Sequence, residues 1–227
     1  MTRLVLVSAV LLVATMTAQA PGSLTAEEKA AGWKLVFDGA SLAGWRAYKS
    51  QTPPAGWRAS NGELIRDAAG GDLMTVEQFG DFELRLDWKI AKNGNSGIMF
   101  RATTEGEFPY STGPEFQILD NAGHKDGQSP LTSAGSNYAV NPPVKDVTKP
   151  VGEWNSVRLI ARGPHVEHWM NGVKLLEYDF GSPDWEARVK ASKFATMPGY
   201  GRAPRGYIVL QDHGDLVTYR NIKIRPL

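Results

Sequence analysis

The sequence is most constrained by a strict alternation of apolar and charged residues that ends at Ile90. One face of this extended segment carries Phe82, Leu84, Leu86, Trp88 and Ile90, and the other carries Glu83, Arg85, Asp87 and Lys89. A period of two residues is typical of an antiparallel β-strand with one buried face and one solvated face. The chain must therefore fold so that one face of a sheet is covered by other elements.

The rest of the chain supports an all-β fold with two short helices. We count about a dozen short apolar runs between turn residues, and Asn61-Gly62 and Asn171-Gly172 are typical of tight hairpins. Thr25 and Glu28 form a predicted capping box for one helix, and Ser182 is the predicted N-cap of the other. Because strands do not alternate with helices, the pattern favours a β-sandwich of two antiparallel sheets.

The N-terminal segment has the features of an export signal. Arg3 precedes an apolar run from Leu4 to Ala14, and Ala18-Gln19-Ala20 offers the small residues of a peptidase site. We therefore predict a signal peptide over residues 1–20, with cleavage near residues 20–22. A linker with a short helix would follow over residues 21–31, and a single domain over residues 32–227. The predicted location is periplasmic or secreted in a bacterium, without membrane contact after cleavage.

Composition excludes several classes of function. The chain has 227 residues, no cysteine and a formal net charge of +1. Disulfides, thiolate metal sites and a cysteine nucleophile are therefore excluded. The balanced and scattered charge gives no reason to expect nucleic acid as a partner.

Candidate site residues are polar groups on otherwise apolar strands. At the period of a strand, Arg101 lies opposite Ile98 and Phe100, whereas Glu115 and Gln117 lie opposite the face of Phe116. A later strand carries Gln211 and His213 on its non-core face, in the same arrangement. We predict that these five polar residues converge on one pocket: Arg101, Glu115, Gln117, Gln211 and His213. The competing interpretation is a set of unrelated surface residues and salt bridges.

A set of ordered motifs resembles a known family. The motifs are Leu35-Val36-Phe37-Asp38-Gly39, Leu42, Gly44-Trp45, Asn95-Ser96-Gly97-Ile98, Arg101, Gly113 to Asp120, Trp154-Asn155, Trp169-Met170-Asn171-Gly172, Leu210-Gln211-Asp212-His213-Gly214 and Arg220-Asn221-Ile222-Lys223-Ile224. In this order they resemble the 3-keto-disaccharide hydrolase domain family, formerly domain of unknown function 1080. The resemblance implies a concanavalin A-like jelly roll and action on glycosides that are oxidised to a ketone at C3.

The chemistry of such a substrate suggests roles for the candidates. A ketone at C3 acidifies the hydrogen on C2, so a base can remove it and the enolate can expel the group at C1. Glu115 or His213 could act as base or acid, and Arg101 or a bound divalent ion could hold the developing charge. Predicted substrate-binding residues are Gln117, Gln211, Asn95, Tyr138 and His168. His165 and His168 face opposite ways in a strand, so they cannot share a metal ion.

Two other functions remain open at this point. A carbohydrate-binding module would use the same fold and face without turnover. A two-carboxylate glycosidase would need a second carboxylate two residues from Glu115, but that position is Gln117. The expected partner is a small carbohydrate, and the only cofactor considered is a divalent metal ion.

Overall fold

The computed structural model describes residues 22–227, so the predicted signal peptide lies outside the described residues. The larger sheet contains β1 (Lys34–Leu35), β3 (Trp57–Ser60), β4 (Glu63–Arg66), β6 (Phe82–Ile90), β9 (Asn155–Arg162), β10 (His165–Met170), β11 (Val173–Asp179) and β13 (Val217–Pro226). The smaller sheet contains β2 (Trp45–Ala47), β5 (Leu73–Thr75), β7 (Asn95–Ala102), β8 (Glu115–Leu119) and β12 (Tyr207–Leu210). The helices are α1 (Ala26–Ala30) and α2 (Pro183–Ala191), and the 3₁₀ turns are η1 (Pro109–Ser111), η2 (Lys125–Gln128), η3 (Pro130–Thr132) and η4 (Lys193–Thr196).

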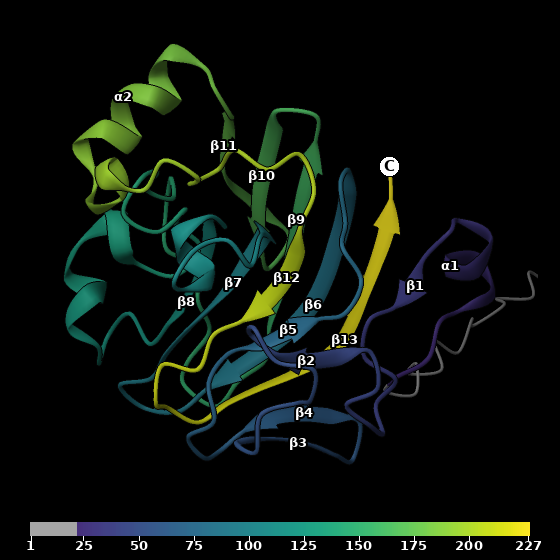
Figure 1. Cartoon of the computed structure of the whole chain (residues 1–227). Helices are drawn as coiled ribbons and strands as arrows, with labels where there is room; N and C mark the ends of the chain where they lie inside the picture. Colours follow the sequence, from purple (N-terminus) through teal and green to yellow (C-terminus); the bar gives the residue numbers. More distant parts are fainter. Residues whose placement is uncertain (1–21) are drawn as a thin grey trace, which may run out of the picture.

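The two sheets are antiparallel and lie face to face (Figure 1). The eight-stranded sheet has the order β11-β10-β9-β6-β13-β4-β3, with β1 also paired to β13, and the five-stranded sheet has the order β2-β5-β12-β7-β8. This arrangement confirms the predicted all-β jelly-roll sandwich with two short helices. No helix in residues 22–227 is long and apolar enough to cross a membrane.

The core fills the space between the sheets. The alternation predicted for β6 is confirmed, because its apolar residues are at most 5% exposed and pack against the inner face of the five-stranded sheet. That inner face is formed by Leu73, Ile98, Phe100, Phe116, Ile118, Ile208 and Leu210, each fully buried. Burial of one face of each sheet is the main source of stability for such a sandwich.

The predicted helix starts are also confirmed. The Thr25 side chain accepts a hydrogen bond from the Glu28 backbone, and the Glu28 carboxylate accepts one from the Thr25 backbone, so both halves of the capping box form. The Ser182 side chain accepts from the Trp185 backbone at the start of α2. Each bond satisfies an N–H group that the helix itself leaves without a partner.

A β-bulge interrupts the regular alternation of β7. Tyr207 is opposite Ala102 and Val209 is opposite Met99, so β7 contains one extra residue over this interval. Arg101 has a positive φ of 48° there. Because of the bulge, the Arg101 side chain does not lie on the same face of the sheet as Met99. Ala102 lies on that face instead.

The Arg101 side chain does not point into a shared pocket. It links the loop before β6 to the loop after β9. It is 4% exposed and donates to the carbonyls of Gly80 (3.0 Å) and Gly163 (2.8 Å) and to Asp81 Oδ1 (3.0 Å). Its guanidinium lies 5.7 Å from the centre of the Phe180 ring, which packs on the core. The prediction that Arg101 belongs to the catalytic cluster is therefore wrong, and its contacts give it a structural role.

This structural role of Arg101 can be tested by truncation. Arg101→Ala should lower the free energy of unfolding by about 2–4 kcal/mol, since it removes a buried charged group that makes three hydrogen bonds. The measurement is urea unfolding, with Arg205→Ala as control, because Arg205 is an exposed arginine with one hydrogen bond to a carbonyl. A variant at position 101 as stable as the control would contradict this role.

Candidate active site

The candidate site lies on the face of the five-stranded sheet that points away from the core, called the site face below. One row across this face, on β5, β12, β7 and β8, consists of Met74, Val209, Met99 and Glu115. In the next row Gly97 is opposite Gln117, and the Gln211 backbone donates to the Gly97 carbonyl at 2.9 Å. The register thus brings together the glutamate and the two glutamines that sequence periodicity predicted.

Glu115 is a buried carboxylate whose pKa is strongly perturbed. Its side chain is 4% exposed in the fold, and no group in residues 22–227 donates a hydrogen bond to its carboxylate. Burial raises the pKa of Glu115 to about 8; Lys193 opposes this shift, while Asp72 and Asp126 add to it. A carboxyl group with such a pKa can change protonation state near neutral pH, which is a requirement for acid–base chemistry.

Gly97 makes room for this carboxylate. A Cβ atom at position 97 would lie 2.0 Å from Glu115 Oε1 and 2.8 Å from its Cγ, so the Glu115 side chain lies directly over the glycine. Any other residue at position 97 would force the carboxylate to move. Gly97 is therefore a positioning residue for Glu115.

Three amide side chains of the site face have oxygens without partners. Asn95 Oδ1, Gln117 Oε1 and Gln211 Oε1 are buried, and no donor in the described part of the chain reaches them. The Gln117 amide nitrogen donates to the Thr132 carbonyl at 3.3 Å, which fixes the orientation of that side chain. A buried acceptor without a partner is costly. Together the three oxygens favour a ligand rich in hydroxyl donors.

Lys193 supplies the positive charge of the site. It begins η4, and its ammonium lies 4.3 Å from the centre of the Tyr138 ring and 5.2 Å from that of Phe194. Burial lowers the pKa of Lys193, whereas Glu115 and Asp126 raise it. The Tyr138 hydroxyl donates to Asp126 Oδ2 at 3.0 Å. The structure thus places Tyr138 beside the site as predicted, and adds Lys193 and Asp126, which the sequence analysis missed.

His213 lies at the rim of the site. Its side chain is 47% exposed, and Nδ1 is 3.9 Å from Asp215 Oδ2, which also accepts from the Asn95 backbone at 3.0 Å. The ring centre of His124 is 6.1 Å from that of His213. No hydrogen bond or ion pair among residues 22–227 joins His213 to Glu115. His213 therefore lies near Asn95 at the start of β7, and no contact joins it to Glu115 as the predicted shared pocket would require.

The prediction that His168 contacts substrate is wrong. His168 is fully buried between the sheets, stacked 4.8 Å from the Phe116 ring, and its Nδ1 is 3.1 Å from the Gly135 carbonyl. Burial lowers the pKa of His168 to about 3, so the ring stays neutral in the core. His165 does face the opposite way, as predicted, on the outer side of the eight-stranded sheet.

The predicted site does not contain a cluster of histidine and carboxylate ligands. In residues 22–227 the group that could offer three such ligands is His165, Glu167 and Glu177 on β10 and β11. Glu115 instead shares its sheet face with amide side chains, and oxygen donors of this kind suit hard cations such as Ca²⁺ or Mg²⁺.

Comparison with known proteins connects this geometry to a family. The pattern of the 3-keto-alpha-glucoside-1,2-lyase-like domain matches residues 32–225. The chain belongs to this family. The resemblance inferred from the ordered motifs is therefore confirmed.

Relatives of known name or structure agree with this assignment. A 3-keto-disaccharide hydrolase of Bacteroides thetaiotaomicron is 35% identical in an alignment of 191 residues that covers 74% of this chain and 66% of that protein. The chain thus spans slightly less than two thirds of that relative. Two crystal structures of candidate glycosyl hydrolases from Parabacteroides distasonis are similar. The first has 35% identity and a TM-score of 0.86, and the match covers 91% of this chain and 99% of the other. The second has 31% identity and a TM-score of 0.70, and the match covers 86% of this chain and 99% of the other.

The raised pKa of Glu115 predicts a pH dependence of stability. The folded-state pKa of about 8 lies above the ordinary value of 4.5. The stability contributed by this group is therefore complete below about pH 4.5 and is lost as pH rises through 8. Glu115→Gln removes this loss, so its melting temperature should rise relative to wild type between pH 5 and pH 8. Glu107→Gln, which changes an exposed glutamate, should follow the wild-type profile; parallel profiles for all three proteins would contradict the assignment.

Gly97→Ala tests the positioning of Glu115 directly. The added methyl displaces the carboxylate from its buried place, so the pKa of Glu115 should fall from about 8 toward the ordinary 4.5. The measurement is a carbon-13 NMR titration of glutamate-labelled protein. Gly80→Ala is the matched control, because a Cβ at position 80 meets its nearest atoms at 3.7 Å and should leave the titration unchanged. An unshifted pKa in Gly97→Ala would show that the carboxylate does not depend on the glycine.

Proposed function

We propose that the protein is an exported enzyme that cleaves 3-keto-glycosides such as 3-keto-disaccharides. The observation that carries the proposal is Glu115, a buried carboxyl group with a pKa of about 8, on a sheet face that also carries amide oxygens without partners. The family assignment and the name of the Bacteroides relative support the same substrate class. The predicted signal peptide supports a periplasmic or secreted location.

In the proposed reaction Glu115 is the base. Its ionised form removes the proton from C2 of the sugar, which the C3 ketone has made acidic. The electron pair of that C–H bond forms an enolate, and the C1–O bond then breaks to release the aglycone. Addition of water to the unsaturated product gives net hydrolysis, so lyase and hydrolase activity share this first step. A base with a pKa near the working pH is well suited to such a transfer.

Positive charge at the enolate oxygen is the second requirement of this reaction. In our proposal Lys193 takes the role that the sequence analysis gave to Arg101, since Lys193 is close enough to influence the pKa of Glu115. A charge placed in advance costs no rearrangement as the enolate forms. A divalent ion bound by the amide oxygens and Glu115 would supply the same kind of charge.

The amide side chains hold the sugar in the proposed complex. Sugar hydroxyls donate to the oxygens of Asn95, Gln117 and Gln211, which otherwise have no partner in the described chain. Tyr138 borders the substrate, and His213 at the rim is the proposed acid for the leaving oxygen. These contacts fix C2 relative to the Glu115 carboxylate, and correct positioning is a large part of catalysis.

Activity of Glu115→Gln tests the proposal. The change preserves size but removes the ionisable group, so release of glucose from 3-keto-trehalose should fall by roughly a hundredfold or more. Initial rates are measured beside unoxidised trehalose, with and without chelator. In wild type the rate should rise with pH toward about 8, as Glu115 ionises, and this rise should be absent from Glu115→Gln.

The outcomes separate the competing functions. Glu107→Gln, the matched control on an exposed carboxylate, should keep the wild-type rate. Binding of the sugar without product release would indicate a carbohydrate-binding module. Equal cleavage of unoxidised trehalose would indicate a two-carboxylate glycosidase, for which Asp72 or Asp126 would be the second carboxylate. A Glu115→Gln variant with more than about a tenth of the wild-type rate would remove Glu115 from the chemistry.

A further inference from the structure

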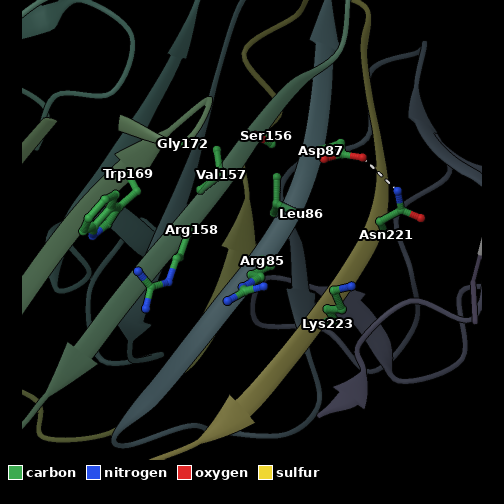
Figure 2. Close-up of a pocket in the computed structure, with 10 residues that line it drawn as sticks. All are labelled: Arg85, Leu86, Asp87, Ser156, Val157, Arg158, Trp169, Gly172, Asn221 and Lys223. Carbon is green, nitrogen blue, oxygen red and sulfur yellow. Dashed lines mark hydrogen bonds between the residues drawn. The ribbon is translucent and has the colours of Figure 1, made fainter. Parts of the chain in front are cut away.

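A second surface feature lies on the opposite side of the molecule from the site face. It is a hollow of about 420 Å³ on the outer face of the eight-stranded sheet, across β10, β9, β6 and β13 (Figure 2). Four of its side chains are direct cross-strand neighbours in one row: Trp169, Arg158, Arg85 and Lys223. This hollow contains none of the predicted site residues.

The cations of this row are close together. Neighbouring strands are about 4.8 Å apart, so the positions of Arg158, Arg85 and Lys223 span only about 10 Å. Like charges directly opposite each other destabilise a sheet. The pairing of β13 with β6 is interrupted by a bulge just before Lys223, where Asn221 has a φ of 55°. The row is therefore an unfavourable arrangement for stability alone.

One buried carboxylate holds the arginines in place. Glu83 is 1% exposed and accepts from Arg158 Nε (2.6 Å), Arg85 Nε (2.9 Å) and Arg225 Nη2 (2.6 Å). Burial alone would raise the pKa of Glu83, but these hydrogen bonds outweigh it and lower the pKa to about 2. Glu83 therefore stays ionised, and the guanidinium groups are fixed before any ligand arrives.

The fixed cations keep charge and donors for a ligand. Glu83 balances one of its three arginines, and Lys223 pairs with Glu28, so the group has two positive charges in excess. Arg158 contacts Glu83 through Nε, and neither of its Nη atoms donates to another group in residues 22–227. Its side chain is 37% exposed, so these donors reach the solvent in the hollow.

Trp169 forms the end of the hollow next to Arg158. The Arg158 guanidinium lies 5.2 Å from the centre of the Trp169 ring, and the indole N–H donates to Glu167 Oε2 at 2.6 Å. The indole is thus held in one orientation at the edge of the cationic row (Figure 2). A flat apolar ring beside fixed guanidinium groups combines a stacking surface with donors that match carboxylate geometry.

We propose that this hollow binds an oligosaccharide that carries carboxylates, that is, a chain containing uronic acid residues. Carboxylates of the chain would pair with Arg158, Arg85 and Lys223, and a sugar ring would lie on Trp169. The stacking surface favours a sugar chain over a simple anion, and the membership of a carbohydrate-acting family agrees with it. This second site does not depend on the reaction proposed for Glu115.

The test is calorimetric titration with tetragalacturonate and, at the same concentration, neutral cellotetraose. Tetragalacturonate should bind and cellotetraose should not, and raising the salt concentration should weaken binding because the side chains of Arg85 and Arg158 are 45% and 37% exposed. Lys223→Gln and Trp169→Ala should each weaken tetragalacturonate binding by about tenfold, as loss of a charged or stacking contact does. Arg158→Gln should do the same, with its melting temperature measured because Glu83 loses a partner.

Matched controls place the binding site. Arg162→Gln removes an exposed arginine from the end of the same strand β9 and should leave the affinity unchanged. Glu115→Gln should also leave it unchanged, because that residue lies on the site face. Equal binding of cellotetraose, or unchanged affinity in Lys223→Gln and Trp169→Ala, would overturn the proposal. Binding of duplex DNA or of anionic phosphatidylglycerol vesicles in place of tetragalacturonate would overturn it as well.

Discussion

The register between β7 and β8 is the constraint on which the site depends. It places Met99 opposite Glu115 and Gly97 opposite Gln117, while the residues between them fill the core. A shift by one residue would move Glu115 into the core and Phe116 out of it. The apolar inner face therefore does more than stabilise the sandwich, because it also fixes which side chains meet on the site face. Gly97 completes this arrangement, since the carboxylate occupies the space where a Cβ would lie.

Periodicity alone predicted the sandwich and the common face of Glu115 and Gln117, because a regular strand obeys a period of two without exception. It failed at Arg101, where a bulge reverses the alternation. The residues around Arg101 contain no glycine or proline that would have signalled the bulge. The prediction also failed for His168, although periodicity places it on the apolar face of Val166 and Met170, opposite His165 and Glu167. A histidine on the inner face stays neutral and packs like an aromatic residue.

Lys193 and Asp126 could not be predicted from local pattern. Lys193 belongs to a 3₁₀ turn far from β8 in the sequence, and Asp126 belongs to one in the loop that directly follows β8. Neither turn has a periodicity that assigns a face. Their approach to Glu115 is a product of the tertiary fold, in which α2 and the loop after β8 close over one end of the five-stranded sheet (Figure 1). For this reason the sequence indicated a carboxylate and amides on this face but gave no sign of Lys193, and it placed the cation at Arg101, whose side chain binds elsewhere.

The charges of Glu115 and Lys193 are arranged as the proposed reaction requires. Burial raises the pKa of Glu115 and lowers that of Lys193, so each charge is disfavoured where it lies. No hydrogen bond or ion pair among the described residues joins the two groups, and the ammonium instead lies over the Tyr138 and Phe194 rings. Aromatic faces stabilise a cation without neutralising it. If negative charge develops on the substrate near Lys193, the ammonium would stabilise the charged transition state more than the uncharged ground state. Catalysis requires such a difference in stabilisation. A direct salt bridge between Lys193 and Glu115 would remove that difference, because it would lower the pKa of Glu115, the proposed base, and pair the ammonium before the substrate binds.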